Sequence, residues 1–404
     1  MHSLTRPTFH LCLLLLFFPL LLHAEKEEGW VINAFPSTSY SNDQGLQLGA
    51  YIDIFNYGKG SHSIFPDYTH RFNIQASWYT LGTIEMHVFY DSEYLIPGFR
   101  LTAALSRTTN NRYPFYGFDP NLPIDLFECT YGRQMNRALV ILQRPLSKHL
   151  NWVAGLTLWH FKTDSGGADS RKTNDQPSLY NWYCQNGIID PHEAGGGTHL
   201  EGKLGVSFDT RDFEFDPDSG IWADACLFGS PDLFNTRHSY LRAAVHWRQY
   251  IPLVRSRFTL AYHLGWQGRL AGDTPFYLAP DITRLYLMHI ESEGLGGRDT
   301  FRGLRMNQLV GDSVAWANVE LRCKLFQLPK LLNHEWLVKA YPFCDMGHAL
   351  KTFRIEDYDV FHVSVGGGVS VAMDRNLIVA FECGKALRHK DGPAAIYIGV
   401  HYTF

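Results

Sequence analysis

The sequence predicts an all-β fold, a transmembrane antiparallel β-barrel of about sixteen strands with a long infolded external loop. Three observations support this prediction. Apolar and polar residues alternate with a period of two from residue 45 to the C-terminus. Aromatic residues make up 14% of the chain and charged residues only 19%. After residue 24, no apolar run reaches the eighteen residues that a transmembrane helix needs.

The N-terminus has the features of a secretory signal peptide. Arg6 supplies positive charge, an unbroken apolar stretch runs from Leu11 to Leu22, and Ala24 precedes a polar segment. This apolar stretch is too short to cross ~30 Å of hydrocarbon as a helix. We therefore expect a signal peptide at 1–24, a short periplasmic N-terminal segment at 25–44 and an outer-membrane β-barrel at 45–404.

The last ten residues show the alternation most clearly. One face is apolar and ends in an aromatic residue: Ile396, Ile398, Val400, Tyr402 and Phe404. The opposite face is mixed: Tyr397, Gly399, His401 and Thr403. A tilted strand of this length crosses a bilayer, so the apolar face is expected to contact lipid and the mixed face to line the lumen.

Charged residues upstream fix the orientation of another strand. Glu320, Arg322 and Lys324 share one face, and Val319, Leu321 and Cys323 share the other. Lipid would penalise three charges heavily, so the charged face must look into a polar lumen.

The same alternation predicts sixteen strands, an even number, as single-chain bacterial barrels have. Their ranges are 45–56, 69–81, 84–93, 98–108, 122–133, 136–145, 150–162, 199–210, 218–229, 237–250, 256–270, 313–326, 335–347, 360–373, 376–388 and 394–404. If the wall begins and ends in the periplasm, odd-numbered connections face outward. The two longest linkers, 163–198 and 271–312, then both lie outside the cell, as barrels of the bacterial outer membrane require.

Three segments carry a more specific signal. The first is Gly294–Leu304, which contains Arg302 and Gly303 and is followed by Asn318–Arg322. The second is Phe343–Gly347, with Asp345 at its centre, and the third is a turn with Asp209, Arg211, Asp212, Pro217 and Gly220. Together they resemble the BamA/TamA outer-membrane assembly-factor superfamily, also called bacterial surface antigen barrels. Leu304 replaces the usual aromatic residue.

The resemblance implies that the loop around Arg302 folds back into the lumen. Glu320 and Asp345 have the same inward parity on adjacent strands, and a guanidinium binds carboxylates in a bidentate manner. We therefore expect an Arg302 cluster with Glu320 and Asp345, with Gly303 allowing a sharp turn. The alternative is that Arg302 is a solvated loop residue and that Glu320 and Asp345 merely line a water-filled pore.

The other two motifs are expected to be structural. Asp209, Arg211 and Asp212, with Pro217 and Gly220, would organise a periplasmic turn through charge pairs and side-chain hydrogen bonds to the backbone. Phe404 matches the terminal aromatic residue that barrel-inserting machinery recognises in this family.

The resemblance further implies insertion or translocation of polypeptides, with a first strand that pairs weakly to the last. The short segment before residue 45 suggests a barrel-only member that lacks polypeptide-transport-associated domains. The expected partners are outer-membrane lipid, nascent outer-membrane proteins and a periplasmic protein that supplies the missing domains.

Other functions are less consistent with the residues. A passive solute channel partly plugged by the loop is the alternative, because sixteen strands enclose a wide lumen. No Ser–His set with an orienting group indicates an enzyme, and no Cys or His spacing indicates a metal or cofactor. A formal net charge of −4 does not suggest nucleic acid. Cys323, Cys344 and Cys383 are expected to face lipid as small apolar residues, with a Cys323–Cys344 bridge as the alternative.

Overall fold

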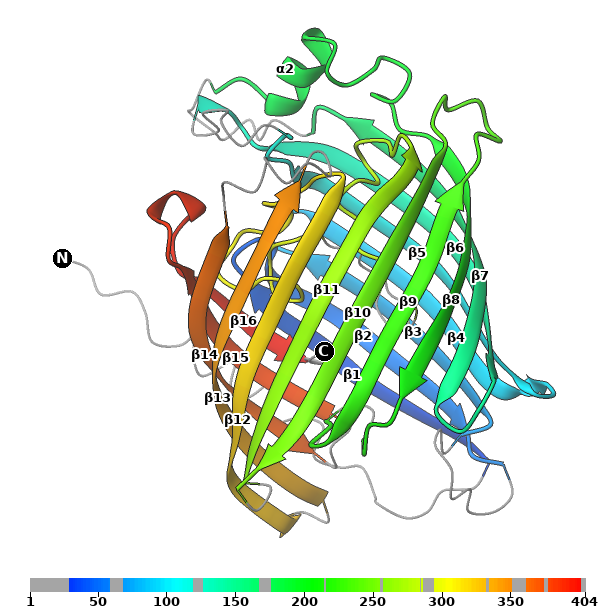
Figure 1. Ribbon diagram of the computed structural model, residues 1–404, viewed down its shortest axis with the longest axis vertical. Coiled ribbons are helices and arrows are strands. Elements are labelled where there is room, and N and C mark those ends of the chain that lie inside the picture. Colours follow the sequence, from blue (N-terminus) through cyan, green and yellow to red (C-terminus); the bar gives the residue numbers. More distant parts are fainter. Residues whose placement is uncertain are drawn as a thin grey trace.

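The computed structural model describes residues 29–58, 68–118, 126–166, 176–213, 216–254, 257–283, 285, 294–331, 334–350, 361–373 and 377–400. The described strands form a closed antiparallel barrel of sixteen strands in sequential order, which confirms the predicted fold (Figure 1). No helix within the described ranges is long and apolar enough to span a membrane. The proposed signal peptide at 1–24 lies outside the described residues.

The strands are connected to their sequence neighbours throughout. They are β1 (Trp30–Ser41), β2 (Gly45–Asn56), β3 (His70–Tyr79), β4 (Thr83–Ile96), β5 (Phe99–Pro114), β6 (Thr130–Pro145), β7 (Leu150–Asp164), β8 (Thr198–Asp209), β9 (Gly220–Ser230), β10 (Tyr240–Leu253), β11 (Phe258–Gly272), β12 (Ser313–Leu331), β13 (His334–Leu350), β14 (His362–Met373), β15 (Leu377–Ala386) and β16 (Ala395–Val400).

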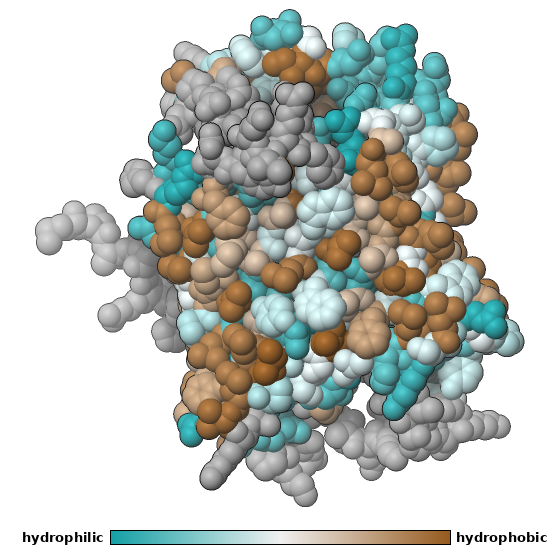
Figure 2. Space-filling model, in the orientation of Figure 1, coloured by the Kyte–Doolittle hydropathy of each residue, from teal (hydrophilic) through white to brown (hydrophobic). Residues whose placement is uncertain are grey.

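The two faces of the wall follow the predicted alternation. Outward side chains such as Leu48, Trp78 and Val365 are exposed, whereas inward side chains such as Asp53 and Glu320 are buried. On the face in Figure 2, hydrophobic residues are spread over the wall among residues of intermediate hydropathy, and many hydrophilic residues lie at the upper end. This distribution suits a wall surrounded by lipid with a polar interior.

The N-terminal boundary of the barrel differs from the prediction. β1 lies within the predicted N-terminal segment 25–44, so the wall starts at Trp30 and not at residue 45. Pro36 weakened the strand pattern, because proline cannot donate a ladder hydrogen bond. In the structure Pro36 lies within β1, opposite Ala50 of β2.

A second error offsets the first in the strand count. Residues 122–133 and 136–145 were predicted as two strands, but Thr130–Pro145 forms the single strand β6. Arg133 and Arg137 lie at the junction of the two predicted strands, and in β6 both point inward and are buried. With β1 added, the connection after β2 is the second and not the first, so β2 ends at the periplasmic end.

The two long linkers are the seventh and eleventh connections, so both lie at the same end of the barrel. We call this the loop end. The short helix α2 (Leu179–Gln185) caps it (Figure 1) and buries Leu179, Tyr180 and Tyr183 in an aromatic cluster. That cluster joins both linkers, because Phe276 and Tyr277 belong to it as well.

The six cysteines in the described part of the chain are free. Cys323 lies opposite Ala340 and Cys344 lies opposite Val319, so the alternative Cys323–Cys344 bridge is not formed.

Candidate functional site

The connection between β11 and β12 enters the barrel from the loop end. Its described residues, 273–283, 285 and 294–312, run between the front and back walls in Figure 1. Phe301, Arg302 and Leu304 near its tip are all buried. The loop therefore packs against inward side chains and does not extend into solvent.

Arg302 lies at the centre of a group of buried carboxylates. Its Nε and Nη2 each donate to a different oxygen of Asp345, both at 2.9 Å. Its Nη1 donates to Glu320 Oε1 and to Glu382 Oε1, both at 2.6 Å. The guanidinium also stacks on the ring of Phe343, with its Cζ 3.6 Å from the ring centre. The structure thus brings Arg302, Glu320 and Asp345 together and adds Glu382.

A second guanidinium balances part of the remaining charge. Arg322 Nε donates to Glu320 Oε2 at 2.8 Å, and Tyr341 Oη donates to Glu382 Oε1 at 3.1 Å. Glu382 was missed because only adjacent strands were compared, and β15 is two strands from β13. Its inward-facing position on β15 and its charge are the sequence features that could have identified it.

Burial makes this network energetically important. The Arg302 side chain is 3% exposed and those of Glu320 and Asp345 are fully buried. Removing one partner from such a buried pair costs about 3–5 kcal/mol, because the other charge is left without compensation. The cluster thus holds the loop against β12, β13 and β15.

The loop tip also contacts the last strand. The Gly303 amide donates to Tyr397 Oη on β16 at 3.2 Å. Gly303 has φ of 90°, and a Cβ there would lie 2.8 Å from the Lys385 nitrogen of β15. Glycine is therefore required both for the conformation and for the close approach of the loop to the wall.

Strand β16 meets β1 in the shortest described pairing of the wall. Among the described residues, β1 and β16 pair only at Tyr40–Ile398 and Ser41–Tyr397. By contrast, β1 pairs with β2 along its whole length. We call the β1–β16 junction the seam. Tyr397 belongs both to the seam and to the loop contact.

The turn between β1 and β2 reinforces the seam at the loop end. Asn42 Oδ1 accepts a hydrogen bond from the Ile396 amide at 2.9 Å. Asp43 accepts one from the Met306 amide of the infolded loop and lies near Arg305. Burial raises the pKa of Asp43 to about 6, although the hydrogen bond and Arg305 oppose this shift. A cavity of about 250 Å³ separates this turn from Leu304.

A second part of the loop crosses the lumen nearer the loop end. Asp281 accepts from Arg133 Nη2 of β6 at 3.0 Å, and its carbonyl accepts from Gln267 Nε2 of β11 at 2.7 Å. His246 Nε2 lies 3.0 Å from the carbonyl oxygen of Thr283. Residues 276–283 are thus bound to both β6 and β11.

The predicted turn motif connects β8 and β9 at the periplasmic end. Arg211 Nη2 binds Asp209 Oδ2 at 2.6 Å, and Asp212 Oδ1 accepts from the amides of Asp218 and Ser219 at 2.9 and 3.1 Å. Gly220 closes the turn with φ of 107°. These contacts organise the backbone of the turn.

The same turn reaches across several strands. Asp216 and Asp218, which flank Pro217, are buried and bind Lys339 of β13 at 2.5 and 3.4 Å. Asp218 also binds Lys324 of β12 at 2.6 Å. Lys324 and Lys339 are direct cross-strand neighbours, and like charges so placed repel each other. The two aspartates neutralise them, so the turn is held inside the periplasmic mouth. Phe404 lies outside the described residues.

Comparison with protein families gives one match. The Omp85 superfamily domain matches residues 89–374, which include the infolded loop, the β8–β9 turn and Asp345. No curated protein matches the chain in sequence.

Several solved structures share the fold. BamA from Haemophilus ducreyi lacking POTRA domains 1–3 is 14% identical with a TM-score of 0.61, over 93% of this chain and 71% of that chain. CdiB from Escherichia coli is 11% identical with a TM-score of 0.59, over 94% of this chain and 64% of that chain. CdiB from Acinetobacter baumannii is 12% identical with a TM-score of 0.52, over 93% and 60%. The chain therefore spans less than two thirds of either CdiB chain.

Proposed function

The chain belongs to the Omp85 superfamily and is a bacterial outer-membrane protein, and we propose that it inserts or translocates polypeptides by opening the seam between β1 and β16. One observation carries this proposal. The described part of the seam has two residue pairs, whereas β1 and β2 are paired from Trp30 to Ser41. The few ladder hydrogen bonds of the described seam support opening of the wall at this junction.

The infolded loop is positioned to control the seam. Arg302 binds carboxylates on β12, β13 and β15, and the next residue, Gly303, binds Tyr397 on β16. The Tyr397 backbone in turn pairs with Ser41 of β1. Movement of the loop tip would therefore change the contacts of both seam strands.

The part of β1 without a described partner at the seam suggests the chemical form of the cargo. Between Trp30 and Ser39, β1 has no described partner on its seam side. An exposed strand edge pairs with an extended segment of another chain through main-chain hydrogen bonds. A nascent outer-membrane protein or a translocating polypeptide would supply such a segment, and a periplasmic partner would deliver it.

A passive solute channel is the second candidate. Inward charges such as Glu201 and Lys203 favour a wet interior. However, the lumen is occupied from the loop end by residues 276–283 and by the loop tip at Arg302. From the periplasmic end, it is narrowed by the turn that contains Asp216 and Asp218. This obstruction argues against steady conduction.

A disulfide across the seam would test the proposal. Tyr40→Cys with Ile398→Cys places two thiols on directly paired residues, in a background whose own cysteines are replaced by alanine. The control is Ala50→Cys with Ala76→Cys, an equally direct pair between β2 and β3. The assay is assisted folding of an outer-membrane β-barrel into vesicles that contain the protein.

We expect oxidation to abolish assisted folding by the seam variant and reductant to restore it, with the control unaffected. Equal assistance before and after oxidation of the seam variant would refute opening of the seam.

A further inference from the structure

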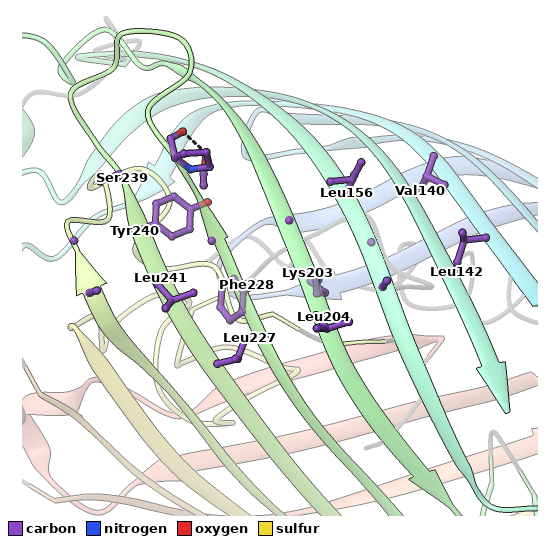
Figure 3. Close-up of a pocket in the computed structure, with 18 residues that line it drawn as sticks. Val140, Leu142, Leu156, Lys203, Leu204, Leu227, Phe228, Ser239, Tyr240 and Leu241 are labelled. Atoms are coloured by element: carbon purple, nitrogen blue, oxygen red, sulfur yellow. Dashed lines mark hydrogen bonds between the residues drawn. The ribbon is translucent and has the colours of Figure 1, made fainter. Parts of the chain in front are cut away.

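The outer face of the wall carries an apolar groove across β6–β11, which reaches the loop ends of β9–β11. Its volume is about 850 Å³. Figure 3 shows Leu156, Leu204, Leu227 and Leu241 on neighbouring strands around it. These four leucines point outward and are exposed, so the groove opens toward lipid and not toward the lumen.

Two paired glycines produce the hollow. Gly202 on β8 lies directly opposite Gly229 on β9. Leu156 is the other neighbour of Gly202, and Leu241 is the other neighbour of Gly229. A Cβ added at Gly202 would meet no atom within 4 Å. The backbone therefore forms the floor of the groove, and leucine side chains form its sides.

The groove ends beneath the β9–β10 loop, since Pro231 and Ser239 line it. This loop exposes two apolar side chains, Leu233 and Phe234, beside an exposed Arg237. Asp232 fixes the loop shape by accepting hydrogen bonds from the Thr236 and Arg237 amides at 2.7 and 3.0 Å. Apolar and cationic groups thus lie together where the wall leaves the membrane.

We propose that this groove binds one acyl chain of an outer-leaflet lipid and that Arg237 contacts the anionic headgroup of the same lipid. The groove lies in the lipid-facing belt of an outer-membrane barrel, so hydrocarbon is the solvent that fills it. Burying a chain against leucines and bare backbone gains dispersion contacts. A guanidinium at the interface attracts a phosphate-bearing headgroup.

Gly202→Leu tests the groove directly, because the new side chain fills open space without displacing the backbone. The matched control is Ala225→Leu, which adds leucine to the outward face of β9 opposite Val206 and Val245. Each protein is reconstituted in vesicles of phosphatidylethanolamine and phosphatidylglycerol and extracted into mild detergent. Retained lipid is then counted by native mass spectrometry.

We expect the wild type and the control to retain one lipid that Gly202→Leu loses. Arg237→Gln should retain a lipid but lose the preference for phosphatidylglycerol over phosphatidylethanolamine with the same chains. Heat-modifiable migration on gels checks that each barrel is folded. The proposal is wrong if folded Gly202→Leu retains as much lipid as the wild type. It is also wrong if the wild type is a dimer that Gly202→Leu converts into a monomer, because a second copy of the chain would then occupy the groove. The lipid-retention assay contains no polypeptide cargo, so its result does not depend on whether the proposed function is correct.

Discussion

Replacing Arg302 with methionine removes the only loop cation in contact with Asp345, Glu320 and Glu382 among the described residues, while much of the side-chain volume remains. Arg322 would still neutralise Glu320. Asp345 would lose both of its guanidinium bonds as well as its charge partner. Loss of one partner from a buried pair costs about 3–5 kcal/mol. Since each 1.4 kcal/mol is a factor of ten, the docked state of the loop would be weakened by about 10²- to 4 × 10³-fold.

Single-channel conductance in planar bilayers measures this effect, because an undocked loop leaves a wider lumen. We expect Arg302→Met to open more often and to larger conductance than the wild type. The control is Arg269→Met at the base of the same loop. Arg269 binds Asp273 and Asp312, but its side chain is 29% exposed. Such pairs contribute about 0–1 kcal/mol, so the control should conduct like the wild type.

A double-mutant cycle separates the pair from general damage. Asp345→Asn alone should also destabilise docking, and the double variant should lose less than the sum of the single variants. If folded Arg302→Met has the conductance of the wild type, then Arg302 does not hold the loop in the lumen and the reasoning fails.

Three further predictions concern the loop tip, the seam turn and the periplasmic mouth. Gly303→Ala should destabilise docking of the loop tip by about 1–3 kcal/mol, because alanine would have to adopt φ of 90° with its Cβ 2.8 Å from the Lys385 nitrogen. Increased proteolysis of the loop would show this effect, and unchanged proteolysis would contradict it. The pKa of Asp43 is raised from 3.8 to about 6, so its neutral form stabilises the fold below pH about 4, and this contribution is lost as the pH rises to about 6. Hydrogen exchange at the Met306 amide should therefore be slower at pH 4 than at pH 7 after correction for intrinsic rates. Asp43→Asn should remove this difference. Lys339→Gln should release Asp216 from the periplasmic mouth, increasing the labelling of a cysteine placed in the turn, whereas Lys148→Gln at an exposed position should leave labelling unchanged.

Most of the wall could be predicted because one-sided contact with lipid imposes strict alternation on each strand. Val319, Leu321 and Cys323 face outward because lipid excludes Glu320 and Arg322 from that side. The prediction failed where this one-sided contact with lipid constrains the sequence less. β6 extends to the loop end, where Arg133 is paired with Asp281, and this stretch was divided into two predicted strands. β1 borders the seam and contains Pro36, which weakens the strand pattern.

The candidate site was only partly predictable for a different reason. Parity along a strand shows that Asp345 and Glu320 point inward, but it gives no distance between side chains on separate strands. Glu382 and Tyr397 reach the same loop tip because the barrel closes and brings β15 and β16 beside it. Likewise, Asp216 and Asp218 lie far in sequence from Lys339, and only closure of the wall brings them together.

The sequence by itself determined the alternating faces of most strands and the inward orientation of Glu320 and Asp345 near the loop arginine, because these depend on solvent contact and on local parity. Only the tertiary structure decided which strands meet at the seam, which charges share Arg302 and where two outward glycines form a groove. Those features depend on strand register and on closure of the barrel, and both are set by contacts between residues distant in the chain.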